Sequence, residues 1–259
     1  MVLLGLIGRL LLPFDPVRVG RFLPSLPPSS EHILGTDSFG RDVYGQLVTG
    51  IILSIQIGFT VAAIGSFVGS IIGFMSGYFG GKVDNLLRSI IDVFLVIPML
   101  AMLILISASI RVLDIPTMSL VLVIFAWASP ARQVRGQTLS LKERDFIYMA
   151  KLSGMNPLEI ILWEISPHMA QWISASFINT ILWAILTETS LDILGLGPLK
   201  AMSLGMLLYW SIFHAAMFRG LWWWWTAPIY TLTFLFLSLF LMHRGLDEMI
   251  NPMFRTKGA

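Results

Sequence analysis

Two acidic residues, Asp92 and Glu188, lie inside long apolar stretches and are the first candidates for chemistry in this sequence. Ionisable side chains are costly to bury among apolar residues, so such positions are functional candidates by default. A hydrolase would need paired catalytic residues within a recognisable motif, and neither acidic residue has one. The chain contains no cysteine and no GxxxxGK[ST] loop for nucleotide phosphates. We therefore expect no enzyme and no catalytic residue, and with four histidines and no cysteine we expect no structural metal site.

Composition indicates a membrane protein. Of the 259 residues, 56% are hydrophobic and only 12% are charged, whereas a soluble domain carries about 25% charged residues. The apolar runs approach the length of about 20 residues that a spanning helix needs. We therefore expect an all-α polytopic membrane protein with about six transmembrane helices, the first of them short or truncated.

The chain is predicted to form one transmembrane domain over residues 1–259. Its expected segments are a partial first span (1–12), an external loop (13–47), spans (48–136), a cytoplasmic element (137–170), and a last part (171–259) with two spans, an external aromatic loop and a cytoplasmic tail. Complete spans are expected near 48–78, 89–110, 118–130, 171–194 and 227–242. The predicted cytoplasmic segments hold ten Lys and Arg residues and the opposite side holds six, which favours this orientation and a cytoplasmic C-terminus.

A row of small residues runs along the first complete span. Gly65, Gly69, Gly73 and Gly77 recur every four residues, and an earlier row of the same kind is formed by Ser54, Gly58 and Ala62. Small residues at this spacing let a second helix backbone approach closely in lipid. We expect Gly69 and Gly73 to face a helix; a glycine-lined pore is the alternative.

The longest polar interruption of the second half runs from Glu143 to His168 and is predicted to form a helix, a turn and a second helix ending near Pro167. Gly154 should end the first helix in a left-handed conformation, and Pro157 should start the second. Met155 and Asn156 should then project from the turn. An element this amphipathic needs a surface against which to bury its apolar side, so we interpret it as a docking element.

The two acidic residues within the apolar stretches, Asp92 and Glu188, allow more than one interpretation. Glu188 could line a polar path across the membrane with Asn179 and Trp183, but it lies about 140° round the helix from Trp183. The favoured alternative is that Glu188 pins its helix near the far interface. Asp92 follows Arg88 by four residues, which predicts a local ion pair.

Aromatic residues gather between the last two spans. Four consecutive tryptophans, Trp222–Trp225, follow a segment that contains Tyr209, Trp210, Phe213, His214 and Phe218. The simpler interpretation is an aromatic belt at the membrane interface. The alternative is a stacking platform at an external mouth, because flat apolar rings suit the faces of sugars. The candidates for that mouth are Tyr209, Trp210, Trp222 and Trp223.

The element at 143–168 resembles the EAA loop of ABC importer permeases, with Ala150, Gly154, Pro157, Ile165 and Pro167 in the matching places. The chain departs from that pattern at Tyr148 and Met149, where the family has Glu and Ala. More specifically, the chain resembles the second permease subunit of dipeptide and oligopeptide importers. That resemblance rests on four further segments: Pro13–Pro16; Leu34–Asp37 with Gly40–Val43; Glu188–Leu191 with Leu194–Gly197; and Gly245–Asp247 with Asn251 and Pro252.

This resemblance implies a type I importer permease fold in a prokaryotic cell membrane. It implies a heterodimer with a second permease, two cytoplasmic ATPases that hold ATP and Mg, and an external solute-binding protein. No cofactor and no nucleic acid would bind this chain itself. The residues implied in ATPase coupling are Ala150, Gly154, Met155, Asn156, Pro157, Glu164 and Pro167.

The solute is predicted from the aromatic segment. The stretch from Ser203 to Trp225 is similar to members of the family that carry cellobiose-type oligosaccharides, so we expect short oligosaccharides or oligopeptides moved by alternating access. A dipeptide, oligopeptide or nickel permease of the same family is the alternative. A passive channel remains a further class, and co-purification of a phosphate-loop ATPase would distinguish it from an importer subunit.

Overall fold

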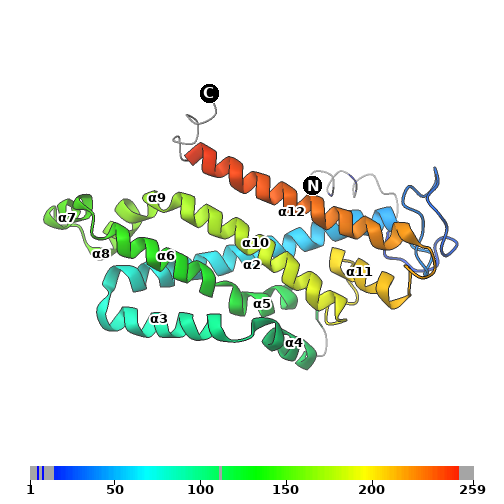
Figure 1. Ribbon diagram of the computed structural model, residues 1–259, viewed down its shortest axis with the longest axis horizontal. Helices are drawn as coiled ribbons and strands as arrows, with labels where there is room; N and C mark the ends of the chain where they lie inside the picture. The colour runs from blue at the N-terminus through cyan, green and yellow to red at the C-terminus, as the bar shows by residue number, and fades with distance from the viewer. Residues whose placement is uncertain (1–4, 6–7, 9–14, 111–112, 251–259) are drawn as a thin grey trace. The chain divides into compact units, whose positions relative to one another are not determined.

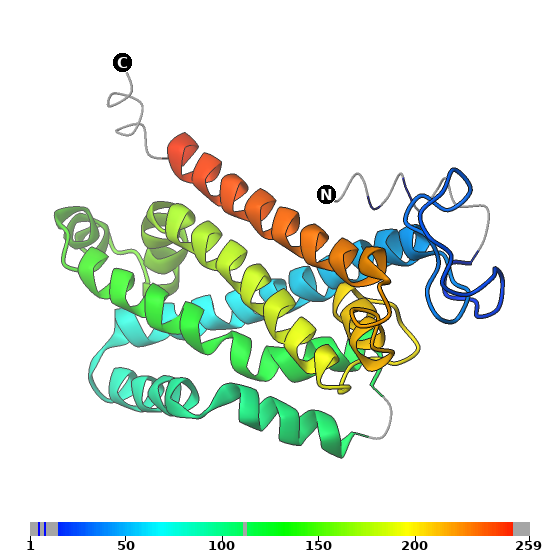
Figure 2. The ribbon, with the colours of Figure 1, turned by 45° about the vertical axis from the view of Figure 1, so that its right-hand side comes forward.

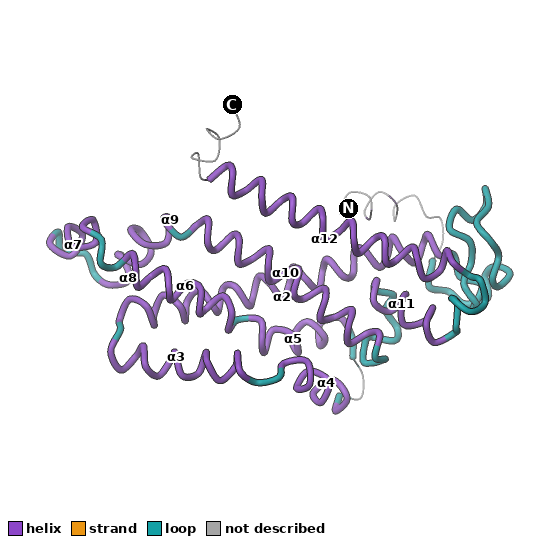
Figure 3. Tube along the Cα trace, viewed as in Figure 1, coloured by secondary structure: helices purple, strands orange, loops and turns teal. Residues whose placement is uncertain are grey.

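The computed structural model describes residues 5, 8, 15–110 and 113–250, with the side chains of 247, 249 and 250 excepted. Within these residues the regular structure from Val43 onward is helical, residues 15–42 form a loop, and the only extended pairing is an isolated bridge between Thr36 and Asp42. The predicted first span at 1–12, apart from residues 5 and 8, lies outside the described residues, and so do the start of the Pro13–Pro16 motif, Asn251 and Pro252. The elements, drawn in Figures 1 and 3, are α2 (Val43–Phe79), α3 (Gly81–Val96), α4 (Met99–Ser109), α5 (Ile115–Ala126), α6 (Ala128–Leu141), α7 (Asp145–Leu152), α8 (Pro157–Glu159), the π-helical η1 (Ile160–Ile165), α9 (Ser166–His168), α10 (Ala170–Ile193), α11 (Leu204–Phe213) and α12 (Trp222–Ile250).

Four helical stretches of the described chain are long and apolar enough to cross a membrane, or five if a bent helix pair counts as one span. The four are Val43–Phe79, Ile115–Leu141, Ala170–Ile193 and Trp222–Leu246. They contain the spans predicted near 48–78, 118–130 and 227–242, and all but the last residue of the one near 171–194. The prediction of an all-helical polytopic chain is confirmed.

The span predicted at 89–110, with Pro98 inside it, is broken at that proline. The helix begins earlier, at Gly81, and α3 and α4 meet at a bend of 79° (Figure 2). Pro98 causes the break, since proline disfavours the helical conformation of the residue before it and cannot donate a backbone hydrogen bond. Ile97 accordingly takes an extended conformation, with φ −59° and ψ 131°.

The chain divides into two compact units. Unit 1 comprises residues 1–59, 103–122 and 182–239, and unit 2 comprises 60–102, 123–181 and 240–259. One buried cluster of unit 1 is formed by Val43, Met202, Met206, Leu207, Ala216, Leu221, Trp223 and Trp224. One buried cluster of unit 2 is formed by Val134, Ile147, Ala150, Ile160, Ile165 and Met169.

The glycine row in unit 2 packs against α6, which confirms the prediction that Gly69 and Gly73 face a helix. A Cβ atom on Gly69 would lie 2.5 Å from the carbonyl oxygen of Trp127, the residue just before α6. A Cβ on Gly73 would lie 2.7 Å from the Cβ of Val134. Protein atoms therefore fill the space that a glycine-lined pore would need at these two positions.

Ion pairs join α3 and α6 within unit 2. Arg135 donates from Nε and Nη2 to the two oxygens of Asp84, at 2.6 and 2.7 Å, and the Ser76 hydroxyl donates to the same carboxylate at 2.5 Å. The predicted pair of Arg88 and Asp92 is confirmed at 3.6 Å. The sequence did not predict that Arg132, 40 residues away, also binds Asp92.

Replacing Arg135 with lysine should lower the thermal stability of the purified protein. A lysine keeps the positive charge but cannot donate to both oxygens of Asp84 as the guanidinium group does. One oxygen of Asp84 therefore loses its hydrogen bond from residue 135. We expect a loss of about 1 kcal/mol, measured as a shift in the unfolding midpoint. The Arg88→Lys variant is the control, because the Arg88 side chain is 61% exposed and makes one long contact; equal shifts in both variants would contradict the role given to the Arg135 pair.

The segment before α2 forms a network that the sequence pattern did not predict. Asp37 is fully buried and accepts hydrogen bonds from Nε of Arg41 at 2.6 Å and from Nε2 of Gln46 at 3.1 Å. His32 Nδ1 lies 3.0 Å from Oδ2 of Asp42. These contacts give the long loop a fixed shape without helix or strand (Figure 3).

Candidate functional site

The turn of the 143–168 element has the predicted backbone. Gly154 takes a φ of +82°, the left-handed conformation that glycine adopts readily. The amide of Met155 closes the end of α7 by donating to the carbonyl oxygen of Ala150 at 3.2 Å. Pro157 then occupies the first turn of α8. The predictions for Gly154 and Pro157 are confirmed.

Of the two residues predicted to project from the turn, Asn156 is exposed and Met155 is only partly exposed. The side-chain oxygen of Asn156 accepts a hydrogen bond from the amide of Glu159 at 3.0 Å, and the Glu159 carboxylate accepts one from the amide of Asn156 at 2.8 Å. This reciprocal pair is a capping box, which commits the Asn156 side chain to starting α8. Met155 is half-buried against the buried cluster of unit 2.

The second half of the element is less regular than the single helix that was predicted. It consists of α8, the π-helical η1 and α9 in succession. Ile160, Ile161 and Ile165 are buried within η1. Ile160, Ile165 and Met169 pack with Val134 of α6 and with Ile147 and Ala150 of α7 in one buried cluster, so the turn is carried on a packed base.

Six apolar side chains of the element remain exposed, and we call them the docking face. They are Tyr148 (48% exposed), Met149 (62%), Leu152 (82%), Leu158 (66%), Leu162 (58%) and Trp163 (72%). Exposed apolar side chains gathered on one element are typical of an interaction site. The amphipathic spacing predicted a docking element, but it did not indicate which apolar residues would face outward.

The residues predicted for coupling divide between the base and the surface. Ala150 is buried, and Met155 and Glu164 are half-buried. Gly154, Asn156, Pro157 and Pro167 are exposed. The small side chain of Ala150 fits the base, whereas Gly154 lies on the surface between the exposed residues Leu152 and Leu158.

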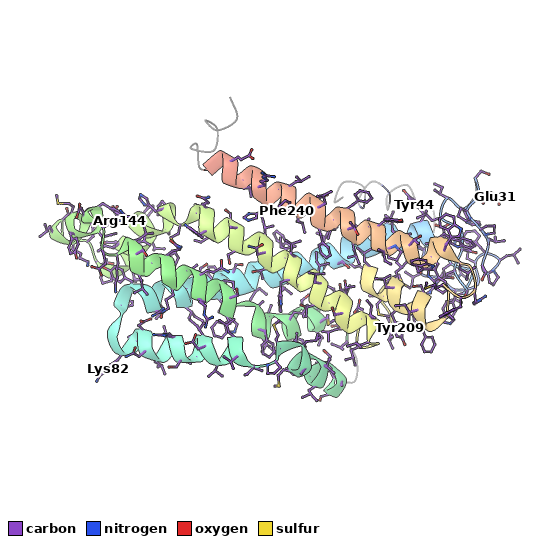
Figure 4. All side chains as sticks on the ribbon, in the orientation of Figure 1. Glu31, Tyr44, Lys82, Arg144, Tyr209 and Phe240 are labelled. Atoms are coloured by element: carbon purple, nitrogen blue, oxygen red, sulfur yellow. The ribbon has the colours of Figure 1, made fainter. Side chains whose placement is uncertain are left out.

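Charged groups border the docking face. The Tyr148 hydroxyl donates to the Glu143 carboxylate at 3.2 Å, and this hydrogen bond raises the pKa of Tyr148. The ammonium group of Lys151 lies 5.3 Å from the centre of the Tyr148 ring. Figure 4 labels Arg144 and Lys82, which come from distant segments of unit 2 and lie at the same end of that unit. The rim therefore carries both signs of charge.

The residues predicted for a path lie on α10 in different environments. Asn179 is exposed, Trp183 is half-buried and Glu188 is fully buried. The Ser54 hydroxyl approaches Oε2 of Glu188 at 3.5 Å. The burial of Glu188 favours the role of pinning α10 over that of lining a path.

The residues predicted to form an external mouth differ in their exposure. Trp222 is 58% exposed, and Tyr209 and Trp210 are half-buried. The position of Trp223 contradicts the prediction: its side chain is 7% exposed and its indole donates to the carbonyl oxygen of Thr36 at 3.2 Å. Four consecutive residues point in all directions around a helix, so at least one of these tryptophans must face inward.

Comparisons with known proteins agree with this architecture. The family described as "Binding-protein-dependent transport system inner membrane component" matches residues 69–255. The oligopeptide transport system permease protein OppC of Mycobacterium tuberculosis is 32% identical over 232 residues, which are 89% of this chain and 79% of that protein. The dipeptide transport system permease protein DppC of Bacillus subtilis is 29% identical over 256 residues, 98% of this chain and 79% of that protein.

A solved structure has the same fold. A chain of the MetNI methionine ABC transporter, in an inward-facing conformation, matches with a TM-score of 0.65 at 16% identity, covering 80% of this chain and 96% of that chain. The fold is therefore that of a type I ABC importer permease. Together with the match over residues 69–255, these similarities show that the chain belongs to the family of binding-protein-dependent transport system inner membrane components, as a permease subunit of an ABC importer.

Proposed function

We propose that this permease passes short oligopeptides by alternating access, as one half of a heterodimer with a second permease subunit. The observation that carries the proposal is the similarity to OppC and DppC, whose names describe oligopeptide and dipeptide transport, over 89% and 98% of this chain. An external binding protein would deliver the solute to a cavity between the two permeases, in a prokaryotic cell membrane.

Energy would come from two cytoplasmic ATPase subunits that bind ATP and Mg, while this chain binds no cofactor itself. The docking face supports this division of labour, because it offers apolar side chains on a packed base to a groove of a partner protein. The charges at its rim, Glu143, Arg144 and Lys151, suit the polar border of such a groove. Motion of the groove would then reach α6 and α10 through the isoleucines of η1.

The proposed orientation places the docking face and the C-terminus in the cytoplasm. Asn179 is the exposed polar residue of α10 that suits a path-lining role, with Trp183 beside it one turn away. Glu188 keeps the pinning role that its burial favours. The exposed mouth would be formed by Trp222 with Tyr209 and Trp210 at its edge.

A cellobiose-type oligosaccharide is the second candidate solute. It is favoured by exposed aromatic side chains next to the predicted mouth: Phe213 (66%), Phe218 (91%) and Trp222 (58%). Flat rings of this kind suit the apolar faces of sugars. The burial of Trp223 and Trp224 leaves fewer rings for that purpose than the sequence indicated.

The solute can be tested with the importer reconstituted from its two permeases, two ATPases and binding protein. We expect ATP-dependent uptake of labelled di- to pentapeptides into proteoliposomes, and tight binding of the same peptides to the binding protein. Cellobiose and nickel ions serve as the competing solutes. Uptake of cellobiose without uptake of any peptide would reject the peptide proposal, and failure of any ATPase to co-purify would reject the importer mechanism.

A further inference from the structure

Two fully buried carboxyl groups lie side by side in unit 1. Glu188 and Asp192 are four residues apart on α10, and each is 0% exposed. Residues at this spacing share one face of a helix. The two side chains therefore lie next to each other inside the protein.

The hydrogen-bond partners that the structure describes for this pair are hydroxyl groups. Ser54 and Thr189 approach Oε2 of Glu188, each at 3.5 Å. The Ser203 hydroxyl donates to Oδ2 of Asp192 at 2.5 Å. Among the contacts that the structure describes for α2, α10 and α11, no Lys, Arg or His side chain faces the pair.

One oxygen of each carboxyl group has no hydrogen-bond partner. These are Oε1 of Glu188 and Oδ1 of Asp192, and both are buried. The backbone of Gly197 lies so close to Oδ1 that a Cβ there would be 1.9 Å away, and a Cβ on Gly205 would be 2.7 Å from Oδ2. This packing leaves no room for a hydrated cation against the Asp192 carboxyl group.

Two adjacent carboxylates cannot both stay charged in such a place. Each buried charge costs several kcal/mol to remove from water, and the like charges repel each other. One proton removes one of the charges, and it also supplies the donor that the two unpartnered oxygens lack.

We propose that Glu188 and Asp192 form a proton-binding site, with one proton held on Glu188 and donated to Asp192. The remaining negative charge lies on Asp192, whose carboxylate accepts a hydrogen bond from the hydroxyl of Ser203. Ser203 is the N-cap residue of α11. The amide of Leu204 donates to Ser54 at 3.2 Å and the amide of Met206 donates to Ser203 at 3.1 Å, so the charge faces the positive end of that helix. The protonated pair thus ties α2, α10 and the start of α11 together.

Infrared spectroscopy of the purified full-length protein tests this site without any transport assay. At neutral pH the wild type should show the carbonyl band of a protonated carboxyl group, which shifts in D2O. A Glu188→Gln variant should fold, because its amide donates to Asp192 in place of the proton, and the wild-type-minus-variant spectrum should show loss of that carboxyl band. An Asp192→Asn variant gives an independent measurement, and its difference spectrum should show loss of an ionised carboxylate.

Thermal unfolding adds a second readout. Glu188→Gln should unfold within a few degrees of the wild type, whereas Glu188→Ala, which leaves Oδ1 of Asp192 without a donor, should unfold at a clearly lower temperature. The assignment of the proton to Glu188 would be overturned by either of two results. One is loss of an ionised carboxylate band in the Glu188→Gln difference spectrum, and the other is loss of the protonated carboxyl band only in the Asp192→Asn spectrum. A wild-type spectrum without a protonated carboxyl band would overturn the site itself.

Discussion

Replacing Gly154 with aspartate is expected to reduce solute uptake and solute-stimulated ATP hydrolysis together, by at least about tenfold, while the spans remain folded. A tenfold loss corresponds to about 1.4 kcal/mol of weakened interaction, which a charge placed within an apolar contact readily exceeds. Gly154 lies between Leu152 and Leu158, two strongly exposed members of the docking face. A carboxylate at that point would have to lose its water when the element enters an apolar groove.

The geometry around Gly154 separates this effect from simple misfolding. A Cβ at this position meets no atom within 4 Å, so the substitution creates no clash inside the protein. The φ of +82° is strained for most residues, but asparagine and aspartate tolerate it better than others. Gly154→Asn is therefore the matched control, since it has the same shape and the same backbone preference without the charge.

Uptake, ATP hydrolysis and thermal unfolding should be measured for both variants in the reconstituted importer. Both variants should unfold at similar temperatures, and only the aspartate variant should lose coupled activity. Normal uptake by Gly154→Asp would show that the turn is not the coupling contact. Equal losses in both variants would instead assign the effect to backbone strain.

Features set by neighbouring residues could be predicted from the sequence. The turn at Gly154 and Pro157 depends on backbone preferences that those two residues carry themselves. The glycine row was recognised because a four-residue period is local to one helix, and its partner needed only to be another helix. The hydropathy of the long helices likewise identified the spans near 48–78 and 171–194.

Features set by distant partners could not be predicted. Asp192 stood at the end of an apolar helix with no sign that Ser203 and two glycines would enclose it. No residue near Arg132 in the sequence indicated that it would bind Asp92, 40 residues away. Trp222 and Trp223 are neighbours of the same type, and Trp223 is buried because distant residues of the same unit, among them Thr36 and Val43, surround it. Apolar residues are similarly ambiguous, since Leu152 and Ile160 differ in exposure and not in chemistry.

Replacing Gly69 with alanine should destabilise the permease, because the added methyl group meets the backbone of the neighbouring helix. The added Cβ would lie 2.5 Å from the Trp127 carbonyl oxygen, 2.7 Å from Cβ of Pro130 and 3.0 Å from the amide nitrogen of Ala131. Two of these atoms belong to the backbone at the start of α6, so they cannot move aside as a flexible side chain could. Overpacking of this kind costs about 1–3 kcal/mol, and a leucine at the same position should block assembly.

Gly136 provides the matched control on the partner helix. A Cβ there meets no atom within 4 Å, and alanine is favoured over glycine inside a helix by about 0.5–1 kcal/mol. The Gly136→Ala variant should therefore unfold at the same temperature as the wild type or slightly above it, whereas Gly69→Ala should unfold several degrees lower and give less monodisperse protein in detergent. Because the two changes add the same methyl group to helices of the same unit, their difference isolates the close contact between α2 and α6. Equal unfolding temperatures would mean that α6 moves away from Gly69 at little cost, and that the glycine row does not hold these two helices together.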